Sequence, residues 1–95
     1  MKTEPNFPVL KVDSNPVRVR LHSEIYIIYV SRKYVAVCDV VISKTRRPAS
    51  IFLGASSLAV QLEDFRDQNN GQLVGLELWI QKETDEKMAK YVVSG

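Results

Sequence analysis

The chain has 95 residues and a mass of 10.8 kDa, enough for one domain and too little for two. Apolar residues make up 45% of it and charged residues 25%, a balance that excludes intrinsic disorder. No apolar run approaches the roughly 20 residues that span a bilayer, and the first residues lack the apolar segment of a secretory signal. Because Cys38 is the single cysteine, no internal disulfide can form. We therefore expect an intracellular protein without a membrane partner, in the cytoplasm or nucleoid, or in the host cell for a phage or viral protein.

The net charge of +2 hides an asymmetry along the chain. Residues 11–47 carry eight basic and three acidic side chains, whereas residues 48–95 carry four basic and seven acidic ones. A basic half of this kind favours a surface that binds a polyanion, although an evenly solvated surface gives the same counts.

The expected elements begin after an N-terminal arm, residues 1–16, which three prolines interrupt. Within the arm, residues 9–12 suit a short edge strand or a flexible segment. Residues 17–21 alternate strictly, so Arg18 and Arg20 share one face of a strand. A second β run covers residues 25–30, and His22-Ser23 is either a bend in one long strand or a short break.

Residues 31–33 form a tight polar connection to a strand over residues 34–42, in which Cys38 and Asp39 lie on opposite faces. A basic loop over residues 43–48 ends at a proline, and residues 50–54 form a short third strand.

The apolar period then changes, because Leu58, Leu62 and Phe65 follow helical spacing and predict a helix over residues 56–69 that stops at Asn70-Gly71. Residues 73–80 return to a period of two and predict a strand. A charged loop over residues 81–87 and a last strand over residues 89–93 complete a domain of residues 17–95.

Residues that would support catalysis are missing from the sequence. His22 is the only histidine, so neither a histidine pair nor a zinc cluster can be built with Cys38. Cys38 lies among valines in the middle of a strand, where a buried thiol is the common outcome. No phosphate-binding glycine motif occurs. We expect a protein that is not an enzyme and that has no metal and no cofactor.

Features suited to binding are better represented. Basic side chains interleaved with aromatic ones are what single-stranded nucleic acid needs, since cations neutralise phosphates and rings stack on bases. Core packing is the alternative for each tyrosine, and Trp79 suits either the core or the binding surface. The candidate nucleic-acid-binding residues are Arg18, Arg20, Arg32, Lys33, Tyr34, Lys44, Arg46, Arg47, Phe52, Trp79 and Lys82.

The short connections favour antiparallel strands, and five strands that avoid exposed edges usually close into a small barrel. With its helix between the third and fourth strands, this order resembles the oligonucleotide/oligosaccharide-binding (OB) fold. Residues 71–76 and 90–93 are similar to the last two strands of small, phage-type single-stranded DNA-binding proteins. The resemblance implies a mainly β, five-stranded antiparallel barrel with one helix. It also implies a binding face that includes Tyr34, Lys44, Arg46, Arg47, Phe52 and Lys82.

A second resemblance is to the transcription-coactivator and PUR-type binders of single-stranded nucleic acid, in which a four-stranded sheet precedes a helix. Residues 17–69 fit that order, with residues 50–53 leading into the helix and residues 73–93 left as an extra hairpin. Both resemblances imply binding of single-stranded DNA or RNA.

A different class of function, a protein-interaction module or a viral or phage accessory factor, is indicated by residues 25–30. These residues are apolar on both faces and suit packing against a protein partner or a second copy. A homodimer is compatible with either class of function.

Overall fold

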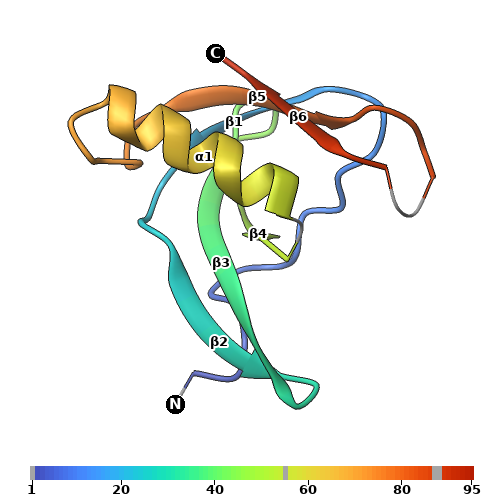
Figure 1. The fold of residues 1–95 in the computed structure, drawn as a ribbon, viewed down its shortest axis with the longest axis vertical. Coiled ribbons are helices and arrows are strands. Elements are labelled where there is room, and N and C mark those ends of the chain that lie inside the picture. Colours follow the sequence, from blue (N-terminus) through green and yellow to red (C-terminus); the bar gives the residue numbers. More distant parts are fainter. Residues whose placement is uncertain (1, 55, 87–88) are drawn as a thin grey trace.

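The computed structural model describes residues 2–54, 56–86 and 89–95, and Figure 1 shows their arrangement. Strands and one helix follow in the order β1 (Val17–Leu21), β2 (Tyr26–Val30), β3 (Lys33–Ile42), β4 (Arg47–Phe52), α1 (Ser56–Gln68), β5 (Glu77–Lys82) and β6 (Tyr91–Ser94). No helix in this described part is both long and apolar enough to cross a membrane.

All strand pairs are antiparallel, as the short connections predict, and they form one six-stranded sheet. The ten-residue strand β3 organises this sheet, because β1 and β2 share one of its edges and β4 occupies the other. The interruption between β1 and β2 is therefore a short break. It is filled by hydrogen bonds from His22 N to Asp39 O (2.8 Å) and from Asp39 N to Ser23 Oγ (3.0 Å).

The sheet does not close, so the expected five-stranded barrel is wrong. Its order is β2-β3-β1-β5-β6, with β4 beside β3, and β4 does not pair with β6. The hairpin of β5 and β6 joins the same sheet through β1 instead of standing apart from it as an extra hairpin. The helix follows β4, at the place in the chain where it was predicted.

Other groups satisfy both edges that would have to meet in a closed barrel. The N-terminal arm lies along β4, where Leu10 N donates to Ser50 O and Ser50 N donates to Pro8 O, both at 2.9 Å. The Gln61 side chain hydrogen-bonds to the outer edge of β6: its Nε2 donates to Tyr91 O (2.7 Å) and its Oε1 accepts from Val93 N (2.9 Å). These contacts pair backbone groups that β4 and β6 would otherwise use to pair with each other.

The main core lies between the sheet and α1. Leu58 and Leu62 are fully buried against inward side chains of the strands, including Leu21 and Ile80, as the helical spacing predicts. The helix ends as expected, because Gly71 takes a φ of +78° and its N–H donates to Arg66 O at 2.8 Å.

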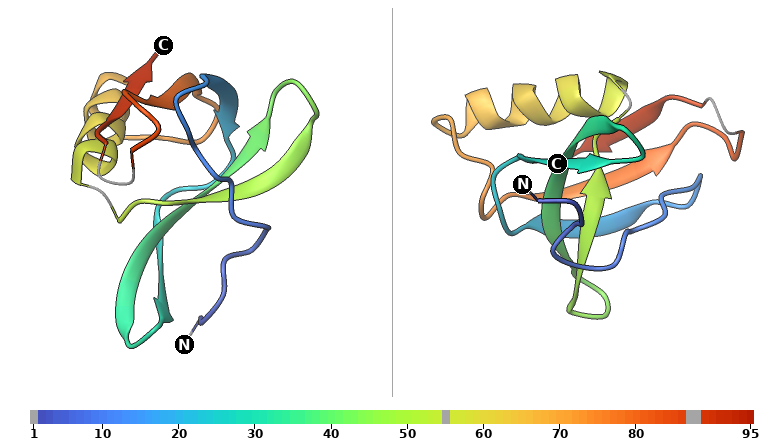
Figure 2. Two further views of the ribbon diagram at one scale, coloured as in Figure 1. Left: turned by 90° about the vertical axis from the view of Figure 1, so that its right-hand side faces the viewer. Right: turned by 90° about the horizontal axis from the view of Figure 1, so that it is seen from below.

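A second, smaller core of Ile28, Val35 and Val37 lies apart from the main one. It belongs to the β2–β3 hairpin, which extends away from α1 (Figure 1). In the left view of Figure 2 the β2–β3 turn and the β3–β4 turn lie at opposite ends of the long strand pair.

Several strand boundaries differ from the prediction. Strand β5 begins at Glu77 instead of residue 73, because Gly75 has a φ of +94° and the N–H groups of Leu73 and Val74 donate to the Glu24 carboxylate (2.8 and 3.1 Å). Two other strands are shifted: β4 spans Arg47–Phe52 instead of residues 50–54, and β6 spans Tyr91–Ser94 instead of residues 89–93. Lys82, predicted in a loop, ends β5.

Candidate nucleic-acid interface

The outer face of β1 and β5 collects charged and aromatic side chains. The register pairs Arg18 with Trp79 and Arg20 with Glu77, while the alternating residues Val19 and Leu78 are buried on the core side. The strict alternation of residues 17–21 thus places both arginines on one face, as predicted.

Trp79 lies on the surface and is 39% exposed, which excludes the alternative that it belongs to the core. The Arg18 guanidinium carbon is 5.4 Å from the centre of the indole ring, within cation–π range. Arg18 Nε also contacts Glu77 Oε2 at 3.0 Å. Both charges are partly exposed, so the ion pair orients the guanidinium over the ring more than it stabilises the fold.

Beside this pair, a groove of about 420 Å³ is lined by Arg20, Val41, Ser43, Arg46 and Glu77. The β3–β4 turn holds Arg46 there, because Arg46 N donates to Ile42 O (2.6 Å) and the residue has a φ of +57°. In residues 2–54, 56–86 and 89–95 the only salt bridge is that of Arg18 with Glu77. We name Arg18, Arg20, Arg46, Glu77 and Trp79 the arginine–tryptophan surface.

Two further candidate cations lie beside the arginine–tryptophan surface. Lys44 is exposed within the β3–β4 turn, and Arg47 is exposed at the first position of β4. Arg47 therefore begins a strand, although the sequence predicted it in a loop. Among the described residues, this end of the sheet carries five cations, Arg18, Arg20, Lys44, Arg46 and Arg47, around the carboxylate of Glu77.

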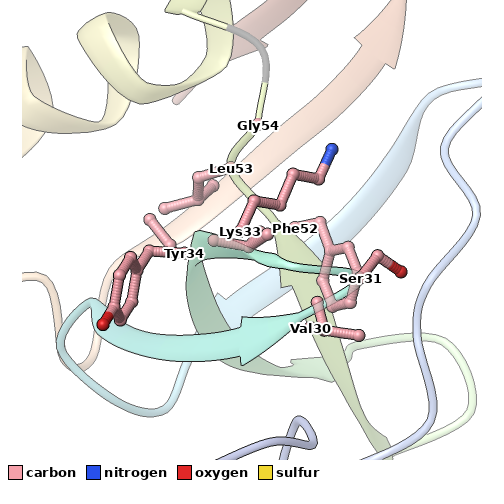
Figure 3. A pocket seen from close by; sticks show the side chains of 9 residues that line it. Val30, Ser31, Lys33, Tyr34, Phe52, Leu53 and Gly54 are labelled. Carbon is pink, nitrogen blue, oxygen red and sulfur yellow. The ribbon is translucent and has the colours of Figure 1, made fainter.

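Three other candidates, Lys33, Tyr34 and Phe52, line a pocket of about 580 Å³ at the other end of β3. Arg32 lies in the adjoining turn and is exposed. Figure 3 shows the pocket where the chain leaves β4 through Leu53 and Gly54. We name it the hairpin-edge pocket.

An aromatic pair adjoins the hairpin-edge pocket, since the ring centres of Tyr29 and Tyr34 are 5.0 Å apart. Tyr34 is 65% exposed. Tyr29 is not among the candidate binding residues that the sequence pattern predicts. Its register opposite Tyr34 depends on the two-residue turn, which the sequence pattern alone does not fix.

The candidates therefore do not form one continuous site. The two turns are separated by the ten residues of β3, about 30 Å of extended chain. Lys82 belongs to neither group, because its Nζ lies 5.5 Å from the centre of the Tyr91 ring beside the N-terminal arm. The binding face implied by the OB resemblance is thus divided between both ends of the sheet.

Cys38 and His22 are the only cysteine and the only histidine of the sequence, two residue types that serve in nucleophilic and metal chemistry. Cys38 is fully buried, and this burial raises the pKa of its thiol to about 12, so the thiol is protonated at neutral pH. His22 is exposed. In the part of the chain that the structure describes, no three or more histidine, cysteine, aspartate and glutamate side chains gather as a metal site would require.

Comparison of the chain with protein-family models, with curated proteins and with solved structures finds no match.

Proposed function

We propose that the protein binds single-stranded nucleic acid, DNA or RNA, on the arginine–tryptophan surface, and that it does so without catalysis. The observation that supports this most is the exposed Trp79 indole on an open sheet face, with the Arg18 guanidinium 5.4 Å from its ring centre and with Arg20 and Arg46 lining the groove beside it.

The chemistry of this surface suits a single strand. An exposed indole offers a flat apolar face on which an unpaired base stacks, and every base has such a face, so little sequence preference is expected. Arginines beside the ring can each contact a phosphate through two N–H groups. Lys44 and Arg47 extend the positive charge from the adjoining turn and from the start of β4.

The fold supports a related proposal, that the chain is an open variant of the OB architecture. The helix after β4 and the pairing of β1 with β5 agree with that architecture. The arm and Gln61 take the place of the closing strand pair. We also propose an intracellular location, which the single, unpaired Cys38 supports.

The direct test is a fluorescence-anisotropy titration with labelled oligo-dT and a matched duplex at several salt concentrations. With three to five phosphates neutralised, we expect a log–log salt slope of about −2 to −3.5 for the single strand. Saturating oligo-dT should also quench Trp79, the only tryptophan. Absence of binding at low salt, or equal affinity for the duplex with unchanged Trp79 emission, would contradict the proposal.

A second function, protein interaction, is favoured by a specific observation on the β2–β3 hairpin. Ile27 and Tyr34 are 55% and 65% exposed, and both lie with Tyr29 on the face opposite the small core. The other face of residues 26–30 packs into the small core. The segment that the sequence predicts to be apolar on both faces therefore leaves only one face for a partner.

A further inference from the structure

Strand β3 has an open edge at the hairpin-edge pocket. Strand β4 pairs with β3 only from Val37 to Ile42, so no strand within residues 2–54, 56–86 and 89–95 pairs with residues 33–36 on that side. The last contact along this edge is the hydrogen bond from Leu53 N to Ala36 O (2.9 Å), after which the chain turns away toward α1.

The register of the hairpin decides which backbone groups face the pocket. Val30 and Lys33 flank a two-residue turn and form its closing hydrogen-bonded pair, so the next pair, Tyr29 with Tyr34, is not hydrogen-bonded. In agreement, Tyr29 N donates outward, to Lys2 O at 2.9 Å. The N–H and C=O of Tyr34 therefore point away from β2, toward the pocket.

The side chains around this edge define the chemistry of a partner. The lining residues include the apolar Val30, Phe52 and Leu53 and the basic Lys33 (Figure 3), and none of the nine is acidic. Arg32 adds a second exposed cation at the turn.

We propose that an extended acidic segment of a partner protein adds as a strand to the free edge of β3, with one apolar side chain in the hairpin-edge pocket and carboxylates near Arg32 and Lys33. Strand addition of this kind draws affinity from main-chain hydrogen bonds and specificity from the pockets beside the edge. The inference rests on the interaction role of the hairpin and is independent of nucleic-acid binding at the arginine–tryptophan surface.

The backbone edge favours a peptide over the other polyanion. Tyr34 presents both a donor and an acceptor, and an extended peptide supplies the complementary pair, whereas a phosphate supplies acceptors alone. A second copy is disfavoured, because residues 32–36 of its β3 edge include two basic and no acidic side chains, and so supply no carboxylate for Arg32 and Lys33.

The test uses a fluorescein-labelled, capped peptide of about six residues that alternates valine and glutamate, the usual length of a strand. Its binding to the wild-type chain is measured by anisotropy and compared with that of the variants Tyr34→Pro and Tyr34→Thr. Proline removes the N–H that faces the pocket and leaves the bonded pairs of the hairpin intact, whereas threonine removes only the ring.

We expect Tyr34→Pro to weaken peptide binding at least about tenfold, because it removes a main-chain hydrogen bond to the peptide. Tyr34→Thr keeps that hydrogen bond and loses only the ring, so we expect it to weaken binding by less than about threefold. Arg32→Ala with Lys33→Ala should also weaken it, and a lysine-for-glutamate peptide should not bind. Should Tyr34→Pro lose its native circular dichroism, the wild-type chain with a peptide N-methylated at alternate residues tests the same bond from the ligand side.

Equal losses for the proline and threonine variants would overturn the proposal, and so would undiminished binding of the N-methylated peptide. Displacement of the peptide by oligo-dT from a site that Arg20→Ala and Arg46→Ala leave intact would assign the hairpin-edge pocket to nucleic acid instead. A concentration-dependent dimer that Tyr34→Pro abolishes would assign it to a second copy. Failure of the wild-type chain to bind oligo-dT leaves the peptide result unaffected, so the two proposals fail separately.

Discussion

Trp79 shows how the position of a residue on a strand decides whether its side chain faces the core or the solvent. Its neighbours in the chain, Leu78 and Ile80, are buried, and the alternation turns the indole outward beside Arg18. An exposed ring of that size fills little buried space and offers a large apolar surface for contact with a ligand.

Trp79→Ala should therefore reduce oligo-dT affinity by roughly 1–3 kcal/mol through lost base stacking. The melting temperature should change little, since the ring fills no buried space. Anisotropy and thermal unfolding measure the two effects, with Tyr34→Ala, an exposed ring at the far turn, as the matched control. A large loss of stability with unchanged affinity would show that the indole is structural.

Asp39 is a buried carboxylate of β3, only 3% exposed. Its Oδ1 accepts from Tyr26 OH (2.6 Å) and Ser50 Oγ (2.8 Å), and its Oδ2 accepts from Asn6 Nδ2 (2.7 Å). Desolvation opposes ionisation, but the hydrogen bonds outweigh it and hold the pKa of Asp39 below its ordinary value.

Asp39→Asn should cost roughly 1–3 kcal/mol of folding stability at neutral pH. Both Asp39 oxygens accept hydrogen bonds, whereas the NH2 group of an asparagine can only donate and would face one of these donors. The lowered folded-state pKa means that this stability is fully present above the unfolded value near 3.8 and is lost as the pH falls through the folded value. The gap between wild type and variant should thus narrow in acid.

Urea unfolding at neutral pH and again well below the unfolded pKa measures that gap. Asp64→Asn, which alters an exposed carboxylate on α1, is the control and should change little at either pH. A gap that widens on acidification would contradict the assignment of Asp39 as an ionised acceptor.

The β2–β3 turn is an element built from unfavourable residues. Ser31 and Arg32 have φ values of +51° and +64°, the left-handed conformation that both central positions of this turn require. Asparagine and glycine adopt that conformation at lower cost.

Ser31→Asn combined with Arg32→Gly should stabilise the fold by about 1 kcal/mol and raise the melting temperature by roughly 4–8 °C. Lys44→Gly in the other turn should give no gain, because Lys44 is not among the residues with positive φ. Calorimetry measures both, and a lower melting temperature for the double variant would refute the turn assignment.

Elements whose signal is local were predictable from the sequence. The helical spacing of Leu58 and Leu62 and the alternation around Arg18 and Arg20 each reflect one face turned to the core. The open sheet was not predictable in this way. It depends on the side-chain amide of Gln61 and on the pairing of the arm with Ser50, contacts between residues 30 or more positions apart.

At the scale of the whole molecule, the basic and acidic halves of the sequence occupy different parts of the structure. Apart from Lys2 and Lys11 in the N-terminal arm, the basic residues of the first half lie toward the two ends of β3, and Glu63, Asp64 and Asp67 are exposed on α1. Composition indicated the basic half, but not that ten residues of one strand separate it into two surfaces. Predicting that separation requires knowledge of the strand register. The sequence therefore predicts the candidate residues but not which of them lie together.

The arginine–tryptophan surface and the hairpin turn offer a matched comparison, because each provides two exposed cations. Arg20→Ala with Arg46→Ala and Arg32→Ala with Lys33→Ala remove the same charge from opposite ends of β3. If charge alone attracts the strand, both variants lose affinity equally.

The decisive measurement is the affinity of these two double variants and the wild type for oligo-dT as a function of salt. We predict that Arg20→Ala with Arg46→Ala loses about 1.4 units of log–log slope, at about 0.7 per phosphate contact, and binds more weakly at every salt concentration. We predict that Arg32→Ala with Lys33→Ala keeps the wild-type slope. The reverse pattern, or equal losses in both, would contradict binding at the arginine–tryptophan surface.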